Sequence, residues 1–336
     1  MKAVRILPGA LLVLLCCAAA GAKPVRHYVF FGQDRERLKA SASVFETKAV
    51  AGAQVAYTWR QLEPEKDRYD FSHVREDLKF LASKGKRLFV QIQDVTFSAS
   101  RTGVPRYLME DGRYGGGADK QYRIEGDDEE HAVAAGWAAR RWDAAVQERF
   151  HKLLFALGEE FDSRVEGVNF AESSVTFGQS VRLHPKGFTP EIYRDALITN
   201  MKALRRAFPK SVVMQYANFM PGEWRPTDDK GYLAAVYRAA KELKVGVGGP
   251  DLMPHRRGQL KSSYPLIREA AGLVPTGIAV QDGNLEEMNP ETGKRVTAAE
   301  LLAFATGYLK VDYIFWGTQE PYFSGDVLPL LERLKP

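Results

Sequence analysis

One pattern recurs eight times along the chain: a short apolar run rich in β-branched and aromatic residues ends in a polar cluster, and a segment with helical spacing follows. Strands that alternate with helices form parallel sheets, and eight such units predict an α/β fold of the (β/α)8 or TIM barrel type. Sites in these barrels lie at the carboxyl ends of the strands, so we expect the functional residues in the polar clusters. The eight runs are 27–33, 53–64, 87–97, 165–175, 211–222, 245–254, 277–284 and 311–323.

The segments between the runs carry signals for helices. Thr189 is an N-cap before Pro190 at the first helical position, and Thr297 forms a capping box with Glu300. The segment 142–161 places its apolar residues on one helical stripe. The spacing of apolar residues changes regularly between that of a strand and that of a helix, which predicts a single domain over 23–336.

One connection is unusually long, because residues 98–141 separate the third run from its helix. The segment contains three consecutive glycines (115–117) and an acidic run (127–130). A long loop without secondary structure is either functional or disordered in most compact domains. We expect a loop on the substrate side, and a surface excursion without function is the alternative.

Residues 1–22 have the features of an export signal, with two basic residues, an apolar stretch over 11–20 and the motif Ala-Gly-Ala at 20–22. Cleavage after Ala22 predicts a periplasmic or secreted protein. Neither this stretch nor any later segment is long enough for a stable membrane span. Both cysteines, Cys16 and Cys17, lie in the signal, so the mature chain would lack disulfides. Lipidation at these cysteines is the alternative, but neither Leu15 nor Cys16 is the small residue that precedes a lipidated cysteine.

The formal net charge of the whole chain is +5, and the basic residues are scattered along it. A nucleic-acid surface needs clustered basic residues, so we expect no nucleic-acid partner, and we expect a monomer. The six histidines show neither His-x-His nor His-Glu-x-x-His spacing, which predicts no metal site and no cofactor. Neither a Gly-x-Ser-x-Gly elbow nor a P-loop is present.

Glu172 is the first catalytic candidate, because it follows the apolar residues Val165 and Val168 in the fourth run. A glutamate at a strand end would project into the barrel mouth, where partial burial raises the pKa of the carboxyl group towards that of a general acid. The structural alternative is a rim glutamate paired with a lysine or arginine.

Asp282, in the polar end of the seventh run, is the candidate for a second carboxylate, since glycoside hydrolysis requires two. An aspartate before a glycine can equally serve to form a turn. Glu320 competes for the second role, and Asp94 and Asp251 are more distant rivals that suit the binding of sugar hydroxyls.

Aromatic and amide side chains gather at the remaining strand ends. Sugars present apolar C–H faces and hydroxyl groups, which match aromatic rings and amides respectively. Packing in the core or at the rim is the alternative for each aromatic ring. The candidates for a carbohydrate-binding surface are Trp59, Arg60, Gln91, Gln93, Asp94, Asn169, Gln215, Tyr216, Asn218, Asp251, His255, Gln281, Trp316 and Glu320.

The second run adds a family resemblance. Trp59 to Pro64, followed by Tyr69, Asp70 and Phe71, resembles the motif W-x-x-L-E-P-x-x-G-x-Y-D-F of (β/α)8 glycoside hydrolases of clan A, including the family 5 and family 42 types. In those enzymes the acid/base glutamate closes the fourth strand and the nucleophilic glutamate closes the seventh. The resemblance therefore implies a glycoside hydrolase with Glu172 as acid/base.

The chain departs from this family pattern at two points. Phe170 and Ala171 separate Asn169 from Glu172, where the clan has asparagine directly before the glutamate, and the seventh run offers Asp282 in place of glutamate. Two other functions therefore stay open. One is a non-catalytic barrel that binds carbohydrate, and the other is an exported barrel enzyme with a non-sugar substrate.

Overall fold

The computed structural model describes residues 24–125, 128–178 and 182–334, and its centre is a closed barrel of eight parallel strands. The predicted export signal and Asp127 lie outside the described residues. All eight predicted strands are present, so the predicted fold class is confirmed. In chain order the barrel strands are β1 (Arg26–Phe30), β2 (Val50–Thr58), β3 (Arg87–Gln93), β7 (Gly167–Phe170), β8 (Val212–Tyr216), β9 (Gly246–Gly249), β10 (Thr276–Val280) and β11 (Tyr313–Gly317).

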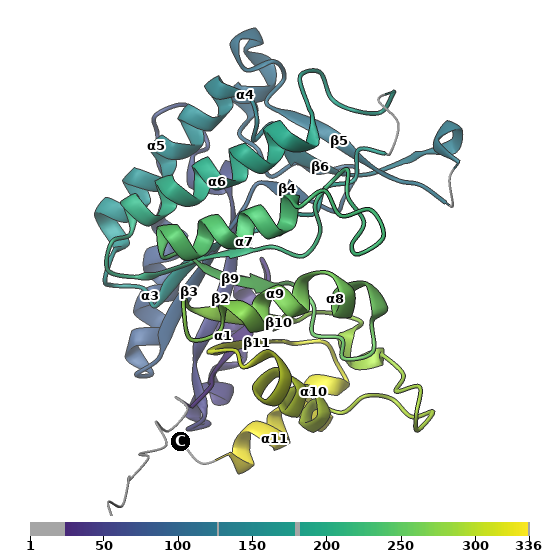
Figure 1. Cartoon of the computed structure of the whole chain (residues 1–336). Coiled ribbons are helices and arrows are strands. Elements are labelled where there is room, and N and C mark those ends of the chain that lie inside the picture. Colours follow the sequence, from purple (N-terminus) through teal and green to yellow (C-terminus); the bar gives the residue numbers. More distant parts are fainter. Residues whose placement is uncertain (1–23, 126–127, 179–181, 335–336) are drawn as a thin grey trace, which may run out of the picture.

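A layer of helices surrounds the barrel, and α5, α6 and α7 lie side by side along it (Figure 1). The predicted caps are present, since the side chains of Thr189 and Thr297 accept hydrogen bonds from the first turns of α6 and α10. The helices are α1 (Arg35–Ala40), α2 (Trp59–Leu62), α3 (Ser72–Ser83), α4 (Arg106–Glu110), α5 (Ala144–Phe161), α6 (Pro190–Ala207), α7 (Tyr232–Leu243), α8 (Arg257–Lys261), α9 (Ser263–Ala270), α10 (Ala298–Phe304) and α11 (Leu328–Arg333). None of those within the described ranges combines the length and the hydropathy of a membrane span.

The core has two parts, because successive side chains of a strand point to opposite faces. Tyr28, Phe89, Met214 and Phe315 belong to one buried cluster, which fills the barrel interior. The larger cluster lies between the strands and the helices. Each strand end therefore directs some of its side chains to the barrel mouth and others under the helices.

The segment 98–141 is a folded insertion, which corrects the expectation of a long loop without secondary structure. Strands β4 (Val95–Thr96), β5 (Ala118–Arg123) and β6 (Val133–Ala139) form a small antiparallel sheet, with β6 in the centre. The central strand β6 is rich in alanine and lacks the apolar alternation that identifies a strand in sequence. The sheet contacts the chain after β7, because Tyr122 N donates to Thr176 O at 2.8 Å. Figure 1 shows β5 and β6 projecting away from the barrel.

Candidate active site at the barrel mouth

Glu172 follows β7 and is half-buried. Its Oε2 accepts a hydrogen bond from Asn218 Nδ2 at 2.6 Å, and it forms no ion pair with any lysine or arginine in the described ranges. Burial of the carboxyl group is the largest cause that raises the pKa of Glu172, to about 7. The charge of Asp251 also raises this pKa, whereas the hydrogen bond from Asn218 and the charge of Arg141 lower it. A carboxyl group that exchanges a proton near neutral pH suits general acid catalysis.

Asn218 comes from the end of β8, the strand next to β7. Its backbone N–H donates to Ser173 Oγ at 3.2 Å, and that hydroxyl donates to Phe219 O at 2.7 Å. Asn218 itself is buried. The amide that holds the Glu172 carboxyl is therefore fixed by hydrogen bonds between two neighbouring strand ends.

Replacing Asn218 by alanine is expected to raise the pKa of Glu172 above its value of about 7, because the ionised carboxylate loses its amide donor. The measurement is an NMR titration of the glutamate carboxyl carbons, with Glu172→Gln identifying the signal. Gln93→Ala is the control, since Gln93 lies at another strand end and donates to Gln91. An unchanged or lower pKa in Asn218→Ala would contradict the role of this hydrogen bond.

Asp251 follows β9 and is half-buried. Its carboxylate accepts from Asn284 Nδ2 at 3.0 Å, and Asn284 Oδ1 accepts from the backbone N–H groups of Leu252 and Gln281, both at 3.0 Å. Each of the two carboxylates is thus held by an asparagine from the next strand end. Asn284 was missed at the sequence level, although it follows the predicted cluster of Gln281 and Asp282.

Asp282 occupies the first inner position of a tight turn, in which Asn284 N donates to Gln281 O at 3.0 Å. Gly283 has a φ of 87°, which a turn of this kind requires and glycine supplies at no steric cost. The Asp282 side chain is exposed. The geometry of Asp282 is therefore that of a turn-forming residue. Its catalytic role stays a prediction.

Glu320 and Arg60 are exposed. Glu320 accepts from Ser324 Oγ at 2.7 Å and lies 3.6 Å from Arg37, so its carboxylate forms part of a local rim network. Arg60 donates from Nε to Val104 O at 2.9 Å, which directs its side chain towards the insertion.

Amide side chains form a hydrogen-bonded floor below the mouth. Gln54 Nε2 donates across the barrel to Asn169 Oδ1 at 2.9 Å and to the Tyr216 hydroxyl at 3.0 Å. Gln93 Nε2 donates to Gln91 Oε1 at 3.2 Å, and Gln33 Nε2 donates to Gln93 Oε1 at 2.7 Å. Gln33 and Gln54 were missed, although Gln54 is the polar residue inside an apolar run. Gln281 and His255 are half-buried at the same end of the barrel.

Four predicted sugar-binding residues lie on the outer side of the barrel wall, which corrects their assignment: Trp59, Asp94, Gln215 and Trp316. Trp59 is 1% exposed and packs on Phe150 with ring centroids 4.9 Å apart. Trp316 is fully buried and donates from Nε1 to His27 Nδ1 at 3.1 Å. Strand alternation on β11 places the Trp316 ring under the helices, and Trp59 at the start of α2 packs its ring there as well, where no substrate can stack on either.

Tyr216 is likewise a buried core residue, packed in the barrel interior beneath the mouth. Its ring is 1% exposed, and its hydroxyl is occupied by Gln54. It therefore supports the floor and offers no face to a sugar.

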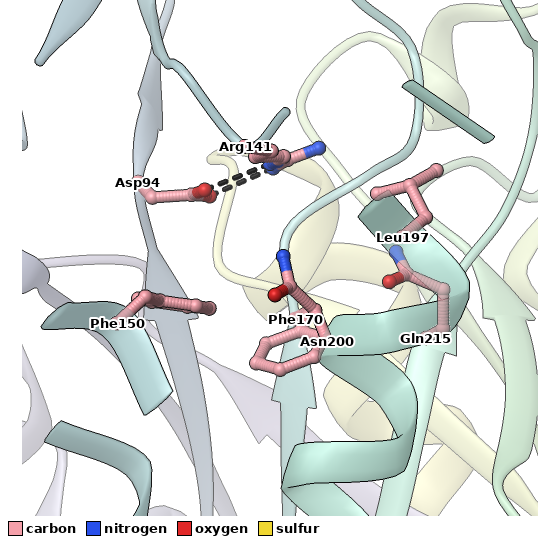
Figure 2. A pocket seen from close by; sticks show the side chains of 7 residues that line it. All are labelled: Asp94, Arg141, Phe150, Phe170, Leu197, Asn200 and Gln215. Carbon is pink, nitrogen blue, oxygen red and sulfur yellow. Dashed lines mark hydrogen bonds and ion pairs between the residues drawn. The ribbon is translucent and has the colours of Figure 1, made fainter. Parts of the chain in front are cut away.

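Asp94 forms a buried ion pair with Arg141, with two contacts of 2.7 Å (Figure 2). Arg141 also donates to the Tyr193 hydroxyl at 2.6 Å and to Glu172 O at 3.2 Å. Gln215 lines a small cavity beside this pair, of about 10 Å³. Such a volume is the room of about one water molecule, so the cavity cannot hold a sugar.

Residues of the motif that carries the family resemblance connect the end of β2 to α5 through ion pairs. Trp59 Nε1 donates to Glu63 Oε2 at 2.8 Å, and Arg149 of α5 forms ion pairs with Glu63 and with Asp67, the latter at 2.7 Å. Asp67 has a φ of 62° at the position where the motif has glycine. Aspartate is among the few residues that tolerate this left-handed conformation, which explains how the turn persists.

The chain therefore belongs to the structural class of (β/α)8 barrels, with two asparagine-bound carboxylates at the carboxyl ends of its strands. No protein-family model matches the sequence, and no curated protein is significantly similar to it. No group of three or more acidic, histidine or cysteine side chains in the described part of the chain is arranged to hold a metal ion.

Solved structures with this fold include several glycoside hydrolases. A β-galactosidase from Bacillus circulans sp. alkalophilus is 11% identical, with a TM-score of 0.56 over 87% of this chain and 50% of its own. A β-galactosidase from Halorubrum lacusprofundi is 12% identical, with a TM-score of 0.54 over 89% and 53%. The catalytic domain of a β-amylase from Paenibacillus polymyxa is 12% identical, with a TM-score of 0.50 over 94% and 100%. The chain spans about half the length of the two β-galactosidases, and at these identities the similarity shows the fold.

Proposed function

We propose that the protein is an exported glycoside hydrolase in which Glu172 is the general acid. The observation that carries the proposal is the Glu172 carboxyl group, half-buried at the end of the fourth barrel strand with a pKa of about 7. A group with this pKa is partly protonated at neutral pH and can donate a proton to the leaving oxygen of a glycosidic bond. The glycoside hydrolases that share the fold are consistent with this reaction.

Because Glu320 is exposed and held in the rim network with Ser324 and Arg37, two candidates for the second carboxylate are favoured over it. Asp282 follows the seventh barrel strand, where the clan A resemblance requires a nucleophile. Asp251 is favoured by two observations: its charge acts on the pKa of Glu172, and Asn284 holds its carboxylate in place. A second carboxylate close enough to act on Glu172 also supports catalysis over the alternative of a non-catalytic carbohydrate-binding barrel.

Asp251→Asn is expected to lower kcat by more than about a hundredfold, whereas Asp282→Asn stays within a fewfold of wild type. Asp251→Asn should also lower the pKa of Glu172, because the neighbouring negative charge is removed. The measurement is the pH dependence of kcat for both variants on an aryl glycoside, with and without added azide, which can substitute for a lost carboxylate. The opposite ranking would assign the second role to Asp282.

Incubation with a panel of cell-wall and exopolysaccharide glycans tests the proposed function as a whole. New reducing ends with wild type, and far fewer with Glu172→Gln, are the expected result. Binding without new reducing ends would favour the carbohydrate-binding barrel, and neither binding nor cleavage would favour a non-sugar substrate. Expression of the full chain tests export, because the mature protein is expected outside the cytoplasm and beginning at Lys23.

A further inference from the structure

Two aromatic rings stack on each other in the loop that follows β8. Phe219 and Trp224 have ring centroids 5.7 Å apart and an interplanar angle of 6°. Trp224 is 60% exposed, whereas Trp59 and Trp316 are buried and Trp137 and Trp142 are half-buried. The structure therefore presents one indole to solvent with a second ring behind it.

The loop holds Trp224 in place on both sides. Gly222 has a φ of 76°, and a Cβ there would lie 2.4 Å from Pro190 Cγ at the start of α6. The carboxylate of Glu223 accepts from the N–H groups of Tyr232 and Leu233 at the start of α7, at 2.9 and 2.7 Å. Trp224 itself exchanges two backbone hydrogen bonds with Asp228, of 2.9 and 2.7 Å. An exposed indole held in this way loses little conformational entropy when a ligand binds.

The loop that carries the stacked pair is hydrogen-bonded to the segment of the candidate general acid. Phe219 directly follows Asn218, which holds the Glu172 carboxyl, and Phe219 O accepts from Ser173 Oγ next to Glu172. Phe219 also approaches Gly258 of α8, where a Cβ would meet its ring at 3.4 Å. The pair is thus part of the same group of strand-end loops as Glu172 and Asp251.

We propose that the exposed face of Trp224 is a binding subsite for a sugar ring next to the one whose glycosidic bond is cut. The inference depends on the proposed function, because it takes the substrate to be a glycan. A pyranose offers an apolar face of C–H groups that matches the flat indole. The Phe219 ring stacks on the other face of the indole and fixes its orientation. Only an oligosaccharide that extends beyond the sugars bound beside Glu172 would contact this subsite.

The test measures binding in the Glu172→Gln background, so that no ligand is consumed. The probes are disaccharides and longer oligosaccharides of the cello-, xylo-, manno- and chito- series. Trp224→Ala is expected to weaken binding of the longer members about 2- to 12-fold, with a much smaller effect on the disaccharides, and Trp224→Phe should retain most of the affinity. Phe155→Ala, which removes a 43% exposed ring on α5 away from the loop, is the matched control and should change neither.

Indole fluorescence supplies a second readout. Binding of a longer oligosaccharide should change the emission of the Glu172→Gln protein, and Trp224→Phe should remove that change. Equal affinity of Trp224→Ala and its parent for every oligosaccharide would overturn the subsite while leaving the proposed function intact, provided that wild type still cleaves glycans. A wild-type protein that neither binds nor cleaves any glycan would overturn both.

Discussion

Replacement of Glu172 by glutamine is expected to lower kcat about 10²- to 10⁴-fold on any glycan that the protein cleaves, because glutamine cannot donate the proton to the leaving oxygen. Glutamine has nearly the same shape and can still hydrogen-bond Asn218, so the barrel should fold unchanged. The measurement is kcat and KM on the glycan identified from the panel. A variant with near-normal kcat would remove Glu172 from the reaction.

The pH dependence supplies a check on the same residue. A general acid must be protonated, so kcat/KM of wild type should fall as the pH rises above about 7, the pKa of Glu172. Glu172→Gln should lack this limb in whatever activity remains. A wild-type profile that stays flat through this range would contradict the role of Glu172 as acid.

The pH dependence of the free energy of unfolding tests the direction of the Glu172 pKa shift and needs no substrate. The pKa of Glu172 is raised from 4.5 to about 7, so between these values the folded protein binds more protons at this site than the unfolded chain. The free energy of unfolding therefore decreases as the pH rises through this window. Glu172→Gln removes the titration, so it should be more stable than wild type at about pH 8, and this advantage should disappear at about pH 4. Denaturant unfolding at both pH values measures the difference.

Replacement of Arg141 by methionine is expected to lower the free energy of unfolding by about 3–5 kcal/mol, because it leaves the buried Asp94 carboxylate without its partner. The side chains of Asp94 and Arg141 are each only 4% exposed and share two contacts of 2.7 Å. The Tyr193 hydroxyl loses its donor in the same variant. Urea unfolding followed by circular dichroism is the measurement.

Arg106→Met is the matched control, since Arg106 pairs with Glu110 on the surface at 3.1 Å with both side chains largely exposed. Exposed pairs of this kind contribute about 0.3–0.5 kcal/mol. The double variant Asp94→Leu with Arg141→Met should recover part of the loss, because no charge then stays buried unpaired. Equal stability of Arg141→Met and Arg106→Met would show that the buried pair contributes no more than a surface pair.

The barrel could be predicted because its determinants are local. Each strand is a short apolar run, and helices such as α6 and α10 have a start signal of their own, at Thr189 and Thr297. The sheet of the insertion was not predicted because β4 has only two residues and the pairing of β5 with β6 has no signal in the apolar pattern. Its central strand, Val133–Ala139, has no alternation that a sequence pattern could detect.

The residues of the site were predicted less evenly. The structure places Glu172, Asn218 and Asp251 together at neighbouring strand ends, and their roles stay predictions. The criterion of a position at a strand end failed for Trp316, because a shift of one residue along a strand turns the side chain to the other face of the barrel wall, and for Trp59, which begins α2 and packs on Phe150. The partners of the carboxylates, such as Asn284 for Asp251, come from other strands and could not be paired from spacing alone.

The sequence by itself determined the eight strands, their order and the strand end that carries Glu172, since these follow from patterns within short segments. Only the tertiary structure decided which carboxylates act on one another. The pKa of Glu172 depends on burial at the barrel mouth and on Asn218, Asp251 and Arg141, which come from separate segments of the chain. Such a group of side chains exists only after the sheet has closed, because closure brings the carboxyl ends of the strands together.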